Sequence, residues 1–217
     1  MSKLFSKDIS LCTQAVTWGL LAASLLTMIP GYPILVGAFL VCLGIFHSFQ
    51  FARESNDILY SVLLPVKKCD VVRSKYAQVL LFEGIAFAIM AALTVVRMTL
   101  LGKAGPYLQN PMMNATPYFL SCVLLVFTFF NILFVGGFFK TAWRMGKPFL
   151  MFGIVAFVFT GVAEVLHHLP GLTFLNAPYG ERLGLHFGIL AAALLVFAVG
   201  TLLSCRASVR RFEKIDL

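Results

Sequence analysis

A carboxyl group and three imidazoles fall close together near the end of one apolar segment. Glu164, His167 and His168 lie at positions i, i+3 and i+4, so a helix would place Glu164 on one face with both histidines. His186 begins the next apolar segment on the same side of the membrane. Such a set could bind a metal ion or transfer protons within a membrane. The set matches neither of the zinc-binding motifs H-E-x-x-H and H-x-x-E-H. The alternative interpretation is a polar cluster in which Glu164 pairs with a histidine.

Two further polar side chains stand inside apolar segments. Glu83 lies deep in one of them, where an ionised group is costly and usually faces protein or water. Its open roles are a substrate contact, an ion pair with Arg97 of another subunit, or a hydrogen-bonded structural glutamate. Asn131 is expected to hydrogen-bond between helices. Together with Glu164 and His168, these residues are the possible polar contacts to a substrate inside the membrane.

The elements that must position these residues are membrane helices. The chain has 217 residues, of which 60% are hydrophobic and 12% charged, whereas soluble domains are about half apolar and a quarter charged. A span needs roughly 20 apolar residues. Six apolar runs meet this need: 13–29, 34–52, 76–101, 117–139, 148–168 and 183–205. We therefore predict an all-α membrane protein, a single transmembrane domain over 1–217 with six helices.

The basic residues predict the orientation. Placing both termini in the cytoplasm leaves only Arg97, Lys103 and Arg182 outside, so 14 of the 17 basic residues lie inside, as the positive-inside rule requires. We expect a multi-pass membrane protein in contact with the lipid bilayer. A net charge of +8 could indicate nucleic acid, but the chain has no soluble basic patch and we expect no such partner.

The N-terminal residues allow two interpretations. The first apolar run, preceded by Lys3 and Lys7, is interpreted as an uncleaved span instead of a signal peptide. Residues 3–12 could form a short interfacial helix or a frayed tail.

The polar stretch 55–76 separates the second and third runs. Ser55 is predicted to be the N-cap of a short helix that Pro65 ends at Leu64, and Asp70 is predicted to cap the third span. An apolar stripe on this helix comprises Ile58, Leu59, Val62 and Leu63, and its other faces carry Asn56, Asp57 and Ser61. The stretch is either a loop lying on lipid headgroups or a docking element for a cytoplasmic partner.

A motif in this stretch resembles a known family. Ser61 to Lys68 (SVLLPVKK), followed by Asp70-Val71-Val72 and Lys75-Tyr76, is similar to a pattern that recurs after the second span of small bacterial permeases of the ABC-2-type transporter superfamily. Leu64 departs from that pattern, which more often has serine-leucine-proline in direct succession. The matching positions are Leu63, Pro65, Val66, Lys67, Lys68, Asp70, Lys75 and Tyr76.

The resemblance implies a half-transporter of the bacterial cytoplasmic membrane that works together with other chains. Two permeases, either two copies or a copy and a paralogue, would pair, and each would rest on a separate cytoplasmic ATP-binding subunit through a coupling helix in the 55–70 loop. Asn56, Asp57, Leu59 and Ser61 are assigned to this contact because they lie on the amphipathic helix. The chain has no G-x-x-x-x-G-K-[ST] run, so we expect no cofactor on it, with ATP and magnesium on the partner.

The predicted function is that of a permease, an exporter subunit without catalytic residues. Two alternatives stay open: an intramembrane enzyme acting on lipid or protein through the glutamate–histidine set, and a peptide-sequestering immunity or sensor protein. The resemblance also implies that the chain between the last two spans dips back into the membrane. Leu169-Pro170-Gly171 would be the break where this begins.

Overall fold

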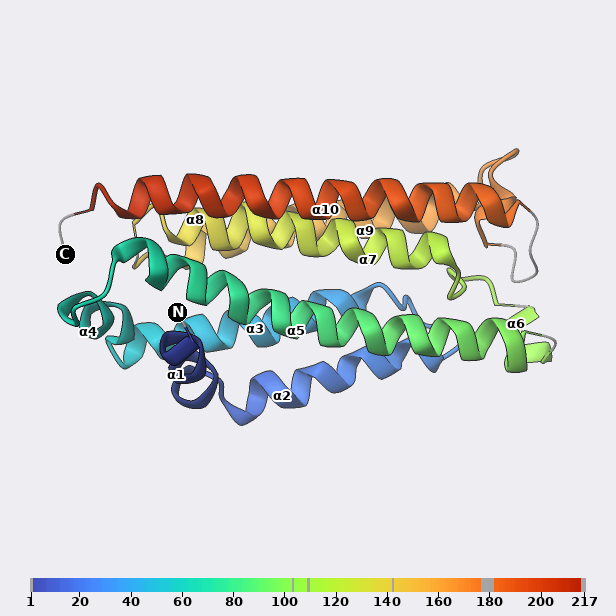
Figure 1. Ribbon diagram of the computed structural model, residues 1–217. Helices are drawn as coiled ribbons and strands as arrows, with labels where there is room; N and C mark the ends of the chain where they lie inside the picture. The colour runs from blue at the N-terminus through green and yellow to red at the C-terminus, as the bar shows by residue number, and fades with distance from the viewer. Residues whose placement is uncertain (1, 103, 109, 142, 177–181, 216–217) are drawn as a thin grey trace.

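The chain folds into a bundle of long helices (Figure 1). The computed structural model describes residues 2–102, 104–108, 110–141, 143–176 and 182–215, and within these residues the regular structure is helical, without a strand. The long elements are α2 (Ala15–Leu21) continued by the 3-10 helix η1 (Ala22–Met28), α3 (Val36–Glu54), α5 (Lys68–Val96), α7 (Pro117–Phe129), α9 (Gly146–Leu166) and α10 (Leu183–Phe212). The short ones are α1 (Ser2–Cys12), α4 (Asp57–Leu63), α6 (Gly105–Leu108), α8 (Gly136–Phe138), the π-helices η2 (Arg97–Leu101) and η3 (Phe130–Val135), and η4 (Thr173–Asn176).

The helices account for five or six membrane spans. Five are long and apolar enough to cross a membrane by themselves, and the sixth requires α1 and the α2–η1 segment, bent by 90° at their junction, to count as one. The third span is longer than the sequence predicted, because α5 and η2 form one stretch of 34 residues that begins at Lys68. An all-α membrane fold is therefore confirmed.

The segment α2–η1 is short but packs closely on α3. Thr17 Oγ1 donates a hydrogen bond of 2.9 Å to the Gly44 carbonyl. A Cβ atom at Gly37 would lie 2.7 Å from the Ala23 carbonyl oxygen, so only glycine allows the two backbones to approach this closely.

Phenylalanine rings fill the middle of the bundle. Phe134 of η3 packs edge-on against Phe46 and Phe49 of α3 at centroid distances of 5.4 and 5.3 Å, and it stacks on Phe130 at 4.9 Å. In contrast, α9 and α10 keep much of their apolar surface on the outside of the bundle.

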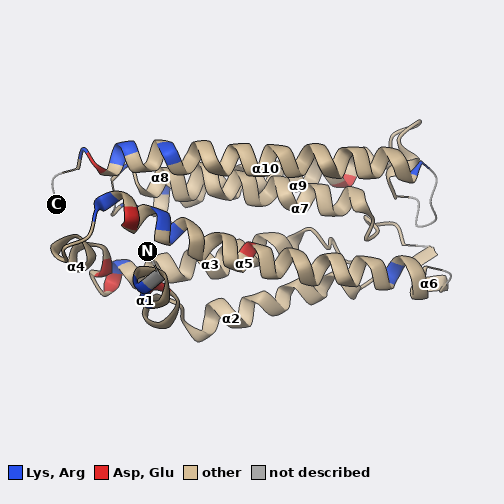
Figure 2. Ribbon diagram, viewed as in Figure 1, with Lys and Arg blue, Asp and Glu red and all other residues tan. Residues whose placement is uncertain are grey.

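Charged residues gather at one end of the bundle, where α1, α4, the start of α5 and the end of α10 meet (Figure 2). We call this the basic end, and the end that carries α6 and η4 the opposite end. The positive-inside rule predicts that the basic end faces the cytoplasm.

Candidate functional site

The helix α4 at the basic end has sharply defined limits. Asn56 adopts a left-handed conformation (φ 53°) immediately before it, which asparagine tolerates better than most residues. Leu64 is extended because it precedes Pro65, and the helix therefore ends at Leu63. The prediction that Ser55 caps α4 was wrong: its hydroxyl donates back to the Phe51 carbonyl at 2.9 Å and closes α3 instead.

A buried lysine joins α4 to two other elements. Lys75 of α5 is 1% exposed, and its Nζ lies 2.8 Å from Asp8 Oδ1 of α1 and 3.3 Å from Asp57 Oδ2 of α4. Lys7 Nζ lies 2.6 Å from the other oxygen of Asp57 and also donates to Ser61 Oγ. These ion pairs fix α1, α4 and α5 relative to one another.

Polar groups surround the acidic side chains of this network. Ser74 Oγ donates to Asp8 Oδ2, and Gln78 Nε2 donates to Thr13 Oγ1 at 3.0 Å. Burial of Asp57 alone would raise its pKa, but Lys75 and Lys7 outweigh that effect and hold the pKa of this carboxyl below its ordinary value.

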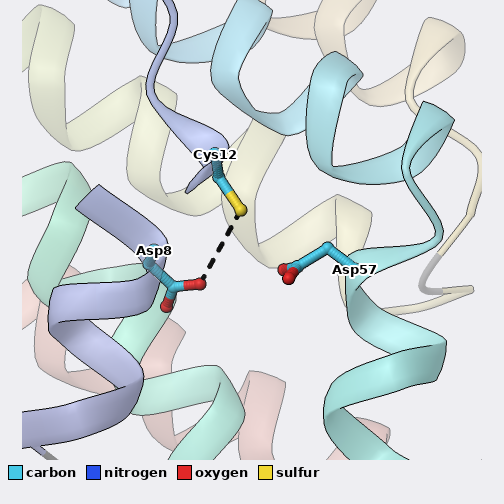
Figure 3. Close-up of side chains that lie close together, drawn as sticks. All are labelled: Asp8, Cys12 and Asp57. Carbon is cyan, nitrogen blue, oxygen red and sulfur yellow. Dashed lines mark hydrogen bonds between the residues drawn. The ribbon is translucent and has the colours of Figure 1, made fainter. Parts of the chain in front are cut away.

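Asp8, Cys12 and Asp57 are close enough to consider as metal ligands. Their donor atoms lie within 4.8 Å of one another, and Figure 3 shows the two carboxyl groups on either side of the Cys12 thiol. The Lys75 ammonium already contacts both carboxylates, at 2.8 and 3.3 Å. We therefore assign the cluster to ion pairing and not to a metal.

The two faces of α4 differ from the predicted amphipathic pattern. Asp57, Ile58 and Ser61 (i, i+1, i+4) point into the protein and are at most 9% exposed. Leu59, Tyr60 and Leu63, which have the same spacing, form the outward face and are 38%, 61% and 85% exposed. The predicted apolar stripe is split between the faces because the lysine network draws the polar side chains inward.

The predicted coupling residues therefore fall into three groups. Those exposed at the basic end are Asn56, Leu59, Leu63, Pro65 and Lys67. Those half-buried are Val66, Lys68 and Asp70. Those buried inside the protein are Asp57, Ser61, Lys75 and Tyr76. Asp70 lies in the first turn of α5 without capping it by its side chain, and Lys67 is the N-cap residue.

The start of α5 is also tied to α10. The Tyr76 hydroxyl lies 2.8 Å from Ser204 Oγ and 3.0 Å from Ser208 Oγ. Lys68 Nζ donates to the Ile215 carbonyl at 2.7 Å. These hydrogen bonds join the start of α5 to α10 and to the residues that follow it.

A second polar group lies deep in the bundle. Asn131 Nδ2 donates to Glu83 Oε2 at 2.9 Å and to Thr201 Oγ1 at 3.2 Å, so Asn131 bridges α5 and α10. Arg97, which was a candidate partner for Glu83, donates instead to the Thr27 carbonyl and to Asn114 Oδ1.

The glutamate and histidines at the opposite end do not converge. Glu164 Oε1 accepts a hydrogen bond from the Met113 backbone N–H at 2.7 Å. His186 Nε2 lies 3.1 Å from the Phe174 carbonyl, and the His167 and His168 rings pack together with centroids 4.1 Å apart. The prediction that Glu164 pairs with a histidine was wrong, since the described salt bridges all lie at the basic end.

The chain after α9 turns where the sequence predicts a break. Gly171 has a φ of 88°, and a short 3-10 helix, η4, follows it. The rest of the predicted dip, residues 177–181, lies outside the described residues.

Sequence reasoning missed several residues of the network at the basic end. Lys7, Asp8 and Gln78 were not assigned, and neither was Tyr60 of the outward face. Asp8 is the only acidic residue among residues 3–12, and this isolated charge in an amphipathic segment was the available signal.

Comparisons with known proteins identify the family. The searches of curated proteins and of solved structures found no match to this chain. A family model described as "ABC-2 family transporter protein" matches residues 3–210, which include the whole of α4 and all but the last two residues of α10. The chain therefore belongs to the ABC-2 transporter family, as a membrane component of an ABC transporter.

Proposed function

We propose that this chain is the permease subunit of an exporter driven by a separate ATP-hydrolysing subunit that binds the outward face of α4. The observation that carries this proposal is the contrast between the two faces of α4. The inner face is fixed by buried ion pairs, whereas Leu59, Tyr60 and Leu63 are exposed at the extreme end of the bundle (Figure 1).

Such a face suits a groove on another protein. Three apolar or aromatic side chains at i, i+1 and i+4 present a compact contact. Membership of the ABC-2 family supports an ATP-binding subunit as the occupant.

The ion-pair network could transmit a displacement of α4 to the membrane helix α5. If ATP binding moves the partner subunits, α4 moves with them, and Lys75 transmits this displacement to α5 because it contacts both α4 and α1. Tyr76, one residue further, contacts Ser204 and Ser208 of α10. A docked helix with rigid links to two spans can shift those spans as a unit.

The proposed transporter also contains other subunits and lies in a particular membrane. A second permease, either another copy or a paralogue, completes the pathway in the bacterial cytoplasmic membrane, and ATP and magnesium bind to the partner subunit. Export is inferred from the resemblance to small bacterial permeases.

The experiment expresses this chain together with its genomic neighbours, purifies it and measures the amount of co-purified ATPase. Leu63→Asp, which changes the most exposed side chain of α4, is expected to lower the amount of co-purified ATPase about tenfold or more, because a charge would have to enter an apolar groove. Leu11→Asp is the matched control, since Leu11 is 63% exposed in α1 at the same end.

Two outcomes would contradict the proposal. One is that no ATPase co-purifies with the unmodified chain. The other is that Leu63→Asp and Leu11→Asp retain the ATPase equally, which would leave α4 as a loop on the lipid headgroups.

A further inference from the structure

A buried arginine lies near the opposite end of the bundle. Arg97 begins the π-helix η2 and is only 4% exposed. Its Nη1 donates to the Thr27 carbonyl of η1, and its Nη2 donates to Asn114 Oδ1 at 3.3 Å. The guanidinium carbon also lies over the ring of Tyr107 in α6, 4.7 Å from the centroid. Arg97 therefore joins η1, α6 and the chain before α7, and all three of these partners are uncharged.

The positive charge of Arg97 has no counter-charge among the described residues. The described salt bridges all lie at the basic end, where they involve Asp8 and Asp57. A buried charge without an opposite charge is costly, and a neutral carbonyl or an aromatic face compensates it only in part. A bound anion would supply the missing charge.

The guanidinium also has hydrogen-bond donors to spare. An arginine carries five N–H groups, and the two described hydrogen bonds of Arg97 leave three of them for another acceptor. The oxygen of Asn114 is already shared, because it also accepts from Asn110 Nδ2 at 3.2 Å. Asn114 is itself held in place by its Nδ2, which donates to the Asn176 carbonyl at 3.2 Å. The donors of Arg97 are therefore fixed in position before any ligand binds.

A small cavity lies directly beside this guanidinium. Its volume is about 10 Å³, and the residues that line it are Arg97, Met98, Gly102, Tyr107, Asn114 and Ala115. This volume is at the lower end of the about 10–15 Å³ that one water molecule needs. The cavity therefore accommodates a single atom-sized ligand in contact with a buried cation.

We propose that this cavity binds one monatomic anion, which is chloride in ordinary salt solutions. The ion accepts from the spare N–H groups of Arg97 and neutralises its charge through charge-assisted hydrogen bonds. Because Arg97, Tyr107 and Asn114 belong to three different segments of the chain, the bound ion stabilises the packing of these segments at the opposite end.

An oxyanion fits the same cavity less well. The phosphate of a lipid head group is a favourable partner for arginine, but it carries its oxygens on one large group, whereas the cavity has room for one atom. The inference goes beyond the proposed function and does not depend on it, because anion binding is measured on this chain without the ATPase.

The test measures chloride binding to the full chain, purified in an uncharged maltoside detergent. Chloride replaces gluconate at constant ionic strength, so that charge screening stays the same. One measurement is the linewidth of the chloride nuclear magnetic resonance signal, which broadens when the ion exchanges with a protein site. Bromide is expected to reverse this broadening by competition, whereas sulfate is not, because it is too large for the cavity. The other measurement is the melting temperature, which chloride is expected to raise by about 3–8 °C.

Two variants separate the contributions of charge and space. Arg97→Gln removes the charge and is expected to abolish both chloride effects, whereas its control Arg182→Gln, an exposed basic position, should retain them. Ala115→Val keeps Arg97 but fills the cavity, and it is also expected to abolish the chloride broadening. Its control is Ala193→Val, because Ala193 in α10 is equally buried (both 3% exposed) and does not line the cavity.

A further variant tests a carboxylate of the chain itself as the counter-charge. Glu181 is an acidic residue that lies outside the described residues. Glu181→Gln is expected to bind chloride as the unmodified protein does.

Four results would overturn the inference. The first is no chloride broadening by the unmodified protein, or equal broadening by Arg97→Gln and Arg182→Gln. The second is competition by sulfate as strong as that by bromide. The third is chloride broadening that appears only in Glu181→Gln, which would make that carboxylate the counter-charge. The fourth is loss of the broadening when phosphatidylglycerol is added, which would identify a lipid phosphate as the ligand.

Discussion

At the scale of single residues, Lys75 is the central group of the basic end. It is buried, and it contacts one carboxylate from α1 and one from α4. A buried charge is tolerated when it is paired and hydrogen-bonded. Removal of one partner leaves the remaining charge buried without compensation, which is strongly destabilising. The position of α4 therefore depends on one side chain.

The first prediction concerns this lysine. Lys75→Met is expected to destabilise the protein by about 3–5 kcal/mol, because two buried carboxylates lose their shared cation. Thermal unfolding in detergent, followed by size-exclusion chromatography, measures the change. Lys67→Met is the control at an exposed position. The triple variant Asp8→Asn/Asp57→Asn/Lys75→Met should be more stable than Lys75→Met alone, and an equal loss in both would contradict the ion-pair assignment.

The second prediction concerns pH. Asp57 has a folded-state pKa below its ordinary value of 3.8, because Lys75 and Lys7 outweigh the opposing effect of burial. A depressed carboxyl pKa contributes stability above the unfolded pKa and loses it as the pH falls through the folded pKa. We therefore expect the melting temperature to fall below about pH 4, and to fall less steeply in Asp57→Asn. Parallel curves for the two proteins would show that another group controls acid unfolding.

At the scale of elements, the π-helix η3 between α7 and α8 is a place where two membrane helices pack closely. In the π-helix η3 the Asn131 carbonyl accepts the Gly136 N–H and also accepts from Ser204 Oγ of α10 at 2.7 Å. Gly136 follows, and a Cβ atom there would lie 2.7 Å from the same Ser204 oxygen. The irregular helix and the glycine together bring α10 into contact.

The third prediction tests this contact. Gly136→Ala is expected to destabilise the protein by about 1–3 kcal/mol, because the added methyl group overlaps Ser204 Oγ. Gly84→Ala in α5 is the matched control, since nothing lies within 4 Å of a Cβ there. Its stability should be unchanged or raised by about 0.5–1 kcal/mol. The double variant Gly136→Ala/Ser204→Ala should recover part of the loss in the same unfolding assay, and a strictly additive effect would exclude the steric explanation.

At the scale of the whole molecule, the bundle has two chemically different ends. Charged residues are concentrated at the basic end (Figure 2), which also carries the ion-pair network and the exposed face of α4. The distribution of charge along the bundle therefore predicts which end faces the cytoplasm.

The fourth prediction concerns orientation. Lys67→Cys at the basic end and Leu169→Cys at the opposite end are both exposed positions, and each is introduced into a variant in which the five native cysteines are replaced. A membrane-impermeant maleimide applied to intact cells should label only Leu169→Cys, because the positive-inside rule places the basic end in the cytoplasm. Labelling of Lys67→Cys instead would reverse the orientation.

The sequence predicted local features well and relations between distant residues poorly. Pro65 and the extended Leu64 define the end of α4 through backbone sterics, which are local. The inward rotation of Asp57 and Ser61 was not predicted, because it depends on Lys7, which lies 50 and 54 residues away in the chain. Glu164 was assigned a histidine as its partner, whereas the observed partner, the Met113 N–H, is 51 residues away in the chain.

The sequence by itself determined that this is a helical membrane protein, because a run of apolar side chains must leave water and a helix satisfies its own backbone groups in lipid. The motif around Pro65 also indicated its family. Only the tertiary structure decided which face of α4 is free, since a buried lysine holds one face inward. It also decided that Glu164 accepts from the Met113 N–H, because that contact depends on how the chain before α7 packs against α9.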